Sequence, residues 1–256
     1  DLEIALDIMA GPIEREAKGW QLNLPESRKS SLKDFNVAIW SNDELAPVSK
    51  DISQRCEDVG KNLASIGANV SYTAKPEHDF LKAEINYQLL LQSVMQSGMS
   101  DDEFKKIEEI ASNLDRNDLS ADAILAKGTV LSHRNWIRQN YAREQIKISW
   151  SKFFQEWDIL ICPQLATTAI EHDHRKMSER TIMIDNQEQR FFQQIFWPGL
   201  AVNAHLPSTV FPTGLASDGM PIGLQAIGAV YEDKTTIKFA ELYEEEFKAF
   251  VVPNLD

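Results

Sequence analysis

The chain has 256 residues, of which 43% are hydrophobic, so it can bury a sizeable core and intrinsic disorder is excluded. Its 39 acidic and 26 basic residues give a formal net charge of -13. An acidic field of this size repels nucleic acid and anionic lipid. We therefore expect no nucleic-acid and no membrane partner, and a small neutral or cationic ligand fits better.

Cysteine content and hydropathy bound the compartment. Cys56 and Cys162 are too few for a disulfide framework, and Cys162 lies in an apolar run. No stretch approaches the roughly 20 apolar residues that a membrane-spanning helix needs. The first residues lack the basic start and apolar block of a secretory signal. These features predict a reducing, cytoplasmic location.

A short helix is the first predicted element, over residues 1–10. Its apolar residues recur at helical spacing, and Gly11 followed by Pro12 is a stop signal. Ile4 and Ile8 fall on a second face, so the helix is apolar around most of its circumference. We expect it to contact protein on several sides.

A strand, helix, strand unit follows over residues 35–72. Residues 35–40 and 69–72 are the strands, and the helix between them carries apolar residues every three or four positions and ends at Gly67. Units of this kind build parallel sheets. Residues from about 79 to 157 then have a helical pattern with few turn signals, which predicts a helical layer.

Strands return in the last hundred residues. A short apolar strand over 159–162 is closed by Pro163, and a long polar connection over 164–189 follows. A helix is predicted over 191–200, then a hairpin with strands over 208–211 and 222–227, and a final aromatic helix. We expect a single α/β domain over residues 1–256, with a mixed sheet flanked by helices.

The most specific motif spans residues 196–228, where FWPGLAVNAHLPSTVFPTG is followed closely by DGMPIGLQAIG. It combines a small-residue helix, a Leu-Pro before an apolar strand, a Pro-x-Gly turn at 212–214 and a Gly-x-Pro-x-Gly-x-Gln strand at 219–225. This block resembles the carboxy-terminal part of the amidase-signature enzymes. DLEIALDIMAGP at 1–12, WDILICP at 157–163, EHDH at 171–174 and the end at 247–253 agree in the same order, so the resemblance spans essentially the whole chain.

The resemblance implies a hydrolase of linear carboxamides that works through a serine acyl-enzyme and needs no cofactor. In this family, catalysis rests on a lysine, an intermediate serine and a nucleophilic serine in a Gly/Ser-rich signature, upstream of the helix that residues 1–12 resemble. The 11 glycines of this chain are never adjacent, and no Gly-Gly-Ser run occurs. We therefore expect no catalytic residue in the chain.

These features predict the carboxy-terminal portion of an amidase, which supplies scaffold and substrate pocket and is inactive alone. Its expected partners are a small-molecule amide and the missing amino-terminal half, and exposed apolar surface predicts a homo-oligomer. The alternative is a non-catalytic subunit or pseudo-enzyme module that pairs with another chain. An unrelated α/β ligand-binding domain is a third reading, against which only the residue-level match argues.

Five residues are the candidate substrate-binding set. Ligands of open α/β sheets collect beyond strand ends, so Leu165 and Thr167, just past Pro163, are expected at the acyl side of the pocket. Phe196, Trp197 and His205 form an aromatic cluster that the resemblance also places there. We expect Pro198 and Gly199 to weaken the helix where Trp197 projects.

Four other local signals have ordinary explanations. His172, Asp173 and His174 contain zinc-ligand types, but alternate residues of an extended loop point to opposite sides, so we expect no metal site. Ser132 and His133 are neighbours on a helix and do not face one another, which argues against a nucleophile and base. Cys162 ends a strand without a catalytic signature. Trp150, Phe153, Phe154 and Trp157 lie at helical spacing, which is typical of core.

Overall fold

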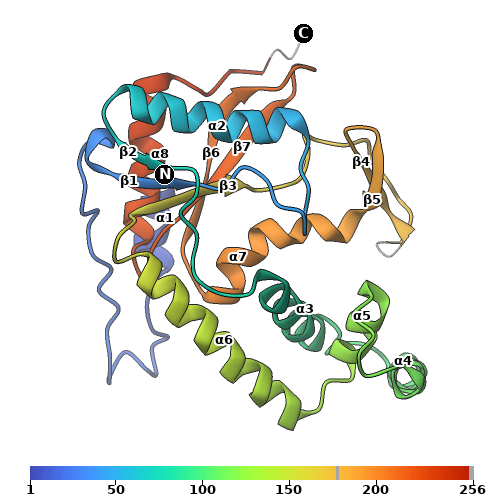
Figure 1. Cartoon of the computed structure of the whole chain (residues 1–256). Helices are drawn as coiled ribbons and strands as arrows, with labels where there is room; N and C mark the ends of the chain where they lie inside the picture. The colour runs from blue at the N-terminus through green and yellow to red at the C-terminus, as the bar shows by residue number, and fades with distance from the viewer. Residues whose placement is uncertain (177–178, 254–256) are drawn as a thin grey trace. The chain divides into compact units, whose positions relative to one another are not determined.

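The chain folds into a sheet unit and a helical unit, and the computed structural model describes residues 1–176 and 179–253 (Figure 1). The sheet unit consists of Asp1–Lys75 and Ser151–Asp256, and the helical unit of Pro76–Trp150. That the whole chain is a single domain stays a prediction.

A five-stranded mixed sheet runs through the sheet unit in the order β2-β1-β3-β7-β6. Its strands are β1 (Asn36–Ile39), β2 (Asn69–Ser71), β3 (Ile159–Pro163), β6 (Ser208–Leu215) and β7 (Pro221–Ile227). β1 is parallel to β2 and β3, whereas β7 is antiparallel to β3 and β6. All five residues of β3 are buried, as expected for a central strand. The mixed sheet predicted from the sequence is confirmed.

Helices cover the sheet on two sides. α2 (Lys50–Ser65) buries its apolar stripe against β1, β2 and β3, and α8 (Asp233–Phe247) packs on β6 and β7. The ring of Phe239 in α8 meets Phe35 and Phe211 edge to face, with centroids 5.3 and 5.7 Å apart. α7 (Phe196–Ala204) lies on the opposite side of the sheet from α2 (Figure 1).

The first predicted helix is α1 (Leu2–Met9), and it contacts α8. None of its residues is buried. The exposed fractions of Leu2, Ile4, Ile8 and Met9 lie between 59% and 79%. The sequence predicts protein on several sides of α1. Within the described residues, its apolar side chains remain exposed.

The connection predicted over residues 164–189 contains a hairpin that the sequence pattern did not predict. β4 (Thr181–Ile184) pairs antiparallel with β5 (Gln187–Arg190), separate from the main sheet. Asp185 and Asn186 form its turn in the left-handed region, with φ of 46° and 68°. Two consecutive left-handed residues make the tight hairpin turn that Asp and Asn tolerate.

Two predicted helices differ from the structure at their ends. The helix predicted over 191–200 is a 3-10 helix, η3 (Phe191–Ile195), followed by α7, which runs on to Ala204. The helix predicted to reach Trp157 ends at Phe153. A second 3-10 turn, η1 (Leu32–Asp34), precedes β1.

The helical unit contains α3 (Phe80–Met95), α4 (Asp101–Asn113), α5 (Ala121–Thr129) and most of α6 (His133–Phe153). Ser100 begins α4 with a complete capping box, and Ser120 caps α5. α3 and α5 approach closely at Gly128, where a Cβ would lie 2.8 Å from the Cβ of Gln92. None of the described helices is long and apolar enough to cross a membrane.

Candidate functional site

Gln225 joins the end of β3 to the start of α7. Its side-chain Nε2 donates to the carbonyl oxygens of Pro163 and Trp197, each at 2.9 Å, and its Oε1 accepts from Ser208 Oγ at 2.9 Å. Only 1% of Gln225 is exposed. A buried amide with every hydrogen paired fixes the groups it contacts, because unpaired polar atoms are costly inside a protein. The strand end and α7 are therefore held at a defined separation.

Trp197 and Phe196 occupy the first turn of α7, and both are buried. Trp197 is fully buried, and its Nε1 donates to the Ala46 carbonyl oxygen at 3.0 Å. Trp40, at the end of β1, meets both rings edge to face, with centroids 5.6 Å from Trp197 and 6.0 Å from Phe196. The three rings form an aromatic cluster beyond β1 and β3, in which each ring is buried against the others.

The expectation that Pro198 and Gly199 weaken the helix where Trp197 projects is wrong. α7 begins at Phe196, so Pro198 lies in the first turn of the helix. The backbone N–H groups of a first turn have no partner within the helix, and proline costs no hydrogen bond there. Trp197 is held by its hydrogen bond and its ring contacts, and no kink aims it.

Leu165 and Thr167 lie in the loop that leaves β3, and this loop is tied to the body on both sides of Thr167. The Ala166 carbonyl oxygen accepts from Ser49 N at 2.8 Å, and Thr168 Oγ1 donates to an Asp218 carboxylate oxygen at 3.4 Å. Leu165 is 46% exposed, and Thr167 is half-buried. The loop therefore places the exposed apolar side chain of Leu165 just beyond the end of β3.

His205 lies at the opposite end of α7 from Trp197. It follows the last helical residue in the left-handed conformation, with φ of 55°, and is exposed. Eight residues of α-helix separate the two positions by roughly 12 Å along the axis. The structure thus brings Phe196 and Trp197 together, and places His205 away from them.

The first turn of α2 holds two hairpin tips beside the loop after β3, which the sequence pattern did not predict. Lys50 N donates to Asp185 at 2.9 Å, and Asp51 accepts from the amide and hydroxyl of Ser217 at 3.1 and 2.6 Å. These bonds from Ser217 hold the pKa of Asp51 below its usual value. No local motif predicts such contacts, because the partners lie more than a hundred residues apart in the chain.

Cys162 offers no nucleophile. It is a free thiol, fully buried in β3, and burial raises its pKa, an effect that a hydrogen bond with Gln225 only partly offsets. Reactive thiols have a lowered pKa and some exposure. Cys56, the other free cysteine, is also buried with a raised pKa.

The run from Glu171 to His174 is arranged around an ion pair. Arg175 contacts both carboxylate oxygens of Asp173, the shortest at 2.7 Å, and lowers the pKa of that carboxyl to about 2. The rings of His172 and His174 are 6.3 Å apart. Within residues 1–176 and 179–253 no group of three potential ligands could hold a metal ion.

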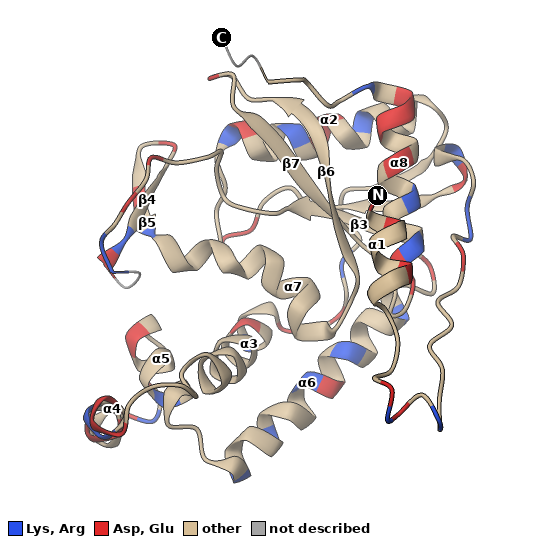
Figure 2. Cartoon of the chain, turned by 180° about the vertical axis from the view of Figure 1, so that it is seen from behind, with Lys and Arg blue, Asp and Glu red and all other residues tan. Residues whose placement is uncertain are grey.

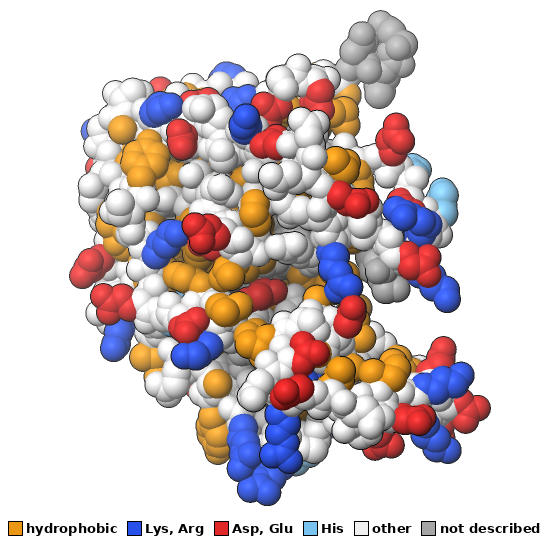
Figure 3. All heavy atoms as spheres, turned by 45° about the vertical axis from the view of Figure 1, so that its right-hand side comes forward, with side chains coloured by type: hydrophobic (Ala, Val, Ile, Leu, Met, Phe, Trp, Pro, Cys, Tyr) orange, Lys and Arg blue, Asp and Glu red, His pale blue; other side chains and the backbone are white. Residues whose placement is uncertain are grey.

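Acidic and basic side chains are interspersed over the face in Figure 3, without a basic stripe.

Ser132 is the residue before α6, and its Oγ accepts from Asn135 N at 3.3 Å, as an N-cap does. His133 is exposed and stacks on Trp136 with centroids 6.5 Å apart. The hydroxyl is thus used by the backbone, which agrees with the interpretation that this pair is not catalytic.

Comparison with known proteins adds to this geometry. A family model described as Amidase matches residues 1–237. A glutamyl-tRNA(Gln) amidotransferase subunit of Thermosynechococcus vestitus is 31% identical over 111 residues, which is 43% of this chain and 21% of that protein. The corresponding subunit of Saccharolobus solfataricus is 25% identical over 95% of this chain and 52% of its own length.

A bacterial aryl acylamidase of the amidase-signature family has the same fold, with a TM-score of 0.67 at 15% identity over 95% of this chain and 50% of its own. The chain thus spans about half the length of the relatives that it matches from end to end. Its family match covers nearly all of its residues and includes the block over 196–228. The chain belongs to the amidase family, whose amidase-signature members its motifs resemble.

Proposed function

We propose that residues 1–256 are the carboxy-terminal portion of an amidase domain that hydrolyses linear carboxamides, and that this portion is inactive alone. The observation that carries the proposal is the family match over residues 1–237, in a chain that spans about half the length of its relatives. The chain would supply scaffold and one side of the substrate pocket.

The chemistry explains the division of roles. Amide hydrolysis through an acyl-enzyme needs a serine, a base that takes its proton, and donors for the oxyanion. The family resemblance assigns these groups to a Gly/Ser-rich segment, and the 256 residues contain no such run. The thiol of Cys162 in β3 is buried, and burial raises its pKa. We infer that the carboxyl-terminal portion binds and positions substrate.

The acyl side of the pocket is assigned to the surface beyond β3. Leu165 is exposed there, and Thr167 lies between two tied residues of the same loop. Phe196 and Trp197 form the floor behind that loop in this proposal, because Gln225 links Trp197 to the strand end. His205 is retained as an outer contact at the far end of α7. The ligand is a small carboxamide, with no cofactor.

The partner of this portion is the remainder of the amidase domain. The outward face of α1, made of Leu2, Ile4, Ile8 and Met9, is the surface that we assign to it. These residues span two neighbouring faces of the helix, and a group of exposed apolar residues of this kind marks an interaction site. In the isolated chain the same face is open to a second copy, so we expect a homo-oligomer. Buried free thiols favour a reducing, cytoplasmic location.

A non-catalytic subunit is the second candidate. Matching relatives are named as subunits of an amidotransferase, and a subunit works beside other chains. In that case the same fold would serve to pair with another polypeptide, and the pocket would carry no turnover in any assembly.

Expressing the longest reading frame that contains residues 1–256, beside the 256-residue chain, separates these readings. We expect hydrolysis of simple aryl and aliphatic amides by the longer product and none by the chain. Turnover by rigorously purified chain, abolished by a point mutation within it, would overturn the proposal. Absence of turnover in both proteins would favour the subunit.

A further inference from the structure

α1 is too short and too exposed to be stable as an isolated helix. Isolated helices shorter than about 12 residues are marginal in water, and α1 has eight residues, none of them buried. Its hydrogen-bonded turns must therefore be stabilised by contacts with α8. Those contacts are ionic where the structure shows side-chain partners.

Lys234, in the first turn of α8, is the centre of these contacts. Its Nζ lies 3.2 Å from Asp7 and 3.4 Å from Glu3, which are four residues apart and share one face of α1. A third carboxylate, that of Glu26, lies at 2.8 Å. The Lys234 side chain is 11% exposed, but the carboxylates of Glu3, Asp7 and Glu26 are 47%, 53% and 78% exposed, so salt screens all three pairs. The carboxylates of Glu26 and Asp7 raise the pKa of Lys234, which keeps the ammonium charged.

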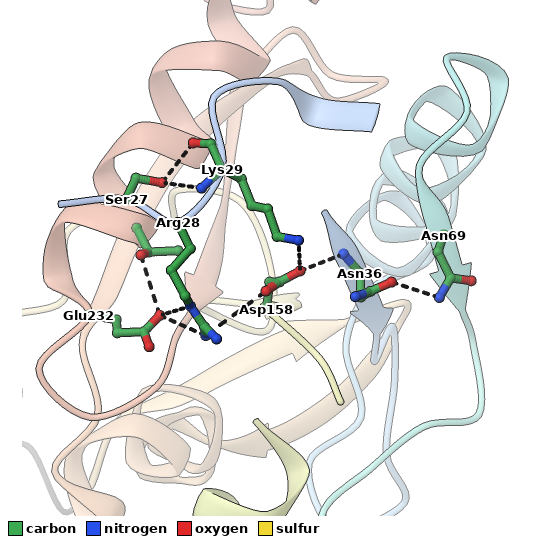
Figure 4. Close-up of polar contacts among 8 residues, drawn as sticks. Ser27, Arg28, Lys29, Asn36, Asn69, Asp158 and Glu232 are labelled. Carbon is green, nitrogen blue, oxygen red and sulfur yellow. Dashed lines mark hydrogen bonds and ion pairs between the residues drawn. The ribbon is translucent and has the colours of Figure 1, made fainter. Parts of the chain in front are cut away.

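A second set of pairs fixes the segment that carries Glu26. Arg28 donates to a Glu232 carboxylate oxygen through Nε at 3.0 Å and through a terminal nitrogen at 2.9 Å (Figure 4). The sign of the charges alternates along both segments, since acidic Glu26 faces basic Lys234 and basic Arg28 faces acidic Glu232. A shift that exchanged these partners would place like charges opposite one another. The pairs therefore specify register as well as contact.

Asp158 anchors the same segment to the sheet. This carboxylate is buried and accepts from Asn36 N in β1 at 2.8 Å, and it lies 3.9 Å from both Arg28 and Lys29 (Figure 4). The chain of contacts thus runs from the sheet through residues 26–29 to Lys234 and on to α1. Charged residues of both signs line α8 where α1 meets it (Figure 2).

We propose that Lys234 is the positioning residue that folds α1 and sets its orientation, so that its charged face lies on α8 and its apolar face points outward. This inference rests on the proposed function in one respect, since the apolar face is taken to bind the remainder of the amidase domain. Pre-folding removes the entropy cost of ordering α1 when the partner arrives.

Hydrogen–deuterium exchange of the 256-residue chain tests this directly, with Lys234→Met, Lys234→Arg and the matched control Lys238→Met. Lys238 lies one turn further along α8 and pairs with Glu241 of the same helix at 2.7 Å, while Glu3 of α1 acts on it only as a weaker, longer-range charge. We expect the amides of residues 5–10 to lose protection by about tenfold or more in Lys234→Met, and to keep most of it in the other two variants. In wild type, raising NaCl from about 0.05 to about 0.5 M should weaken protection of α1 but not of α2.

Equal protection of α1 in wild type and Lys234→Met would overturn the proposal, as would an equal loss in Lys238→Met. Should Lys234→Met fail to fold, which unprotected amides in α2 would reveal, the salt response of the wild-type chain still decides. These readouts need no turnover, so their failure is distinct from failure of the proposed function, which the reading-frame assay measures.

Discussion

Replacing Gln225 by methionine removes three hydrogen bonds from the interior of the sheet unit while keeping a side chain of similar length. The carbonyl oxygens of Pro163 and Trp197 lose a donor in a site that solvent does not reach, since Gln225 is 1% exposed. Each buried acceptor left unpaired costs about 1–3 kcal/mol. Both oxygens also lie in regular elements that can supply one further bond, so we expect a total loss of about 2–4 kcal/mol in the free energy of unfolding.

Urea unfolding at 25 °C, followed by far-UV circular dichroism, measures this loss as a lower midpoint at unchanged slope. Ser208→Ala is the matched control, because it removes only the bond to Gln225 Oε1 from an exposed residue. It should cost less than about 1 kcal/mol. A Gln225→Met variant within about 0.5 kcal/mol of wild type would show that this amide does not hold the strand end and α7 together.

Three further outcomes follow from the structure. Burial lowers the pKa of His78 from 6.5 to about 4, so as pH falls the unfolded chain takes up the imidazole proton before the folded chain does. The urea midpoint should therefore fall as pH drops from about 6.5 to about 4, and His78→Asn should reduce this dependence on pH. Trp197→Ala should lower the free energy of unfolding by about 3–5 kcal/mol in thermal melts, and a loss below about 1 kcal/mol would contradict a core role. Elemental analysis of chelator-free protein should find no stoichiometric zinc at His172 and His174; one equivalent would contradict this.

Local patterns predicted the parts of the fold whose cause is local. The stripe of apolar residues in α2 and the unbroken apolar run of β3 gave the right elements, because period and burial go together. The hairpin over 181–190 was missed, since its turn uses Asp185 and Asn186 without a glycine. The motif over 219–225 contained Gln225, but nothing in its spacing showed which carbonyl oxygens the amide contacts.

The candidate site divides in the same way. The position of Leu165 and Thr167 just beyond a strand end could be predicted, because a proline closes that strand. The bonds of Asp51 to Ser217 and of Lys50 to Asp185 could not, since each joins residues more than a hundred positions apart. Such contacts depend on how the hairpins return to the sheet, which no window of neighbouring residues contains.

The sequence by itself determined the family, the class of fold and the apolar character of α1, because motif identity and hydrophobic periodicity are properties of neighbouring residues. Only the tertiary structure decided that Lys234 gathers Glu3, Asp7 and Glu26, and that the face of α1 opposite them stays open. An ammonium is attracted to every carboxylate within reach, and which carboxylates come within reach is set by the packing of α1 and α8.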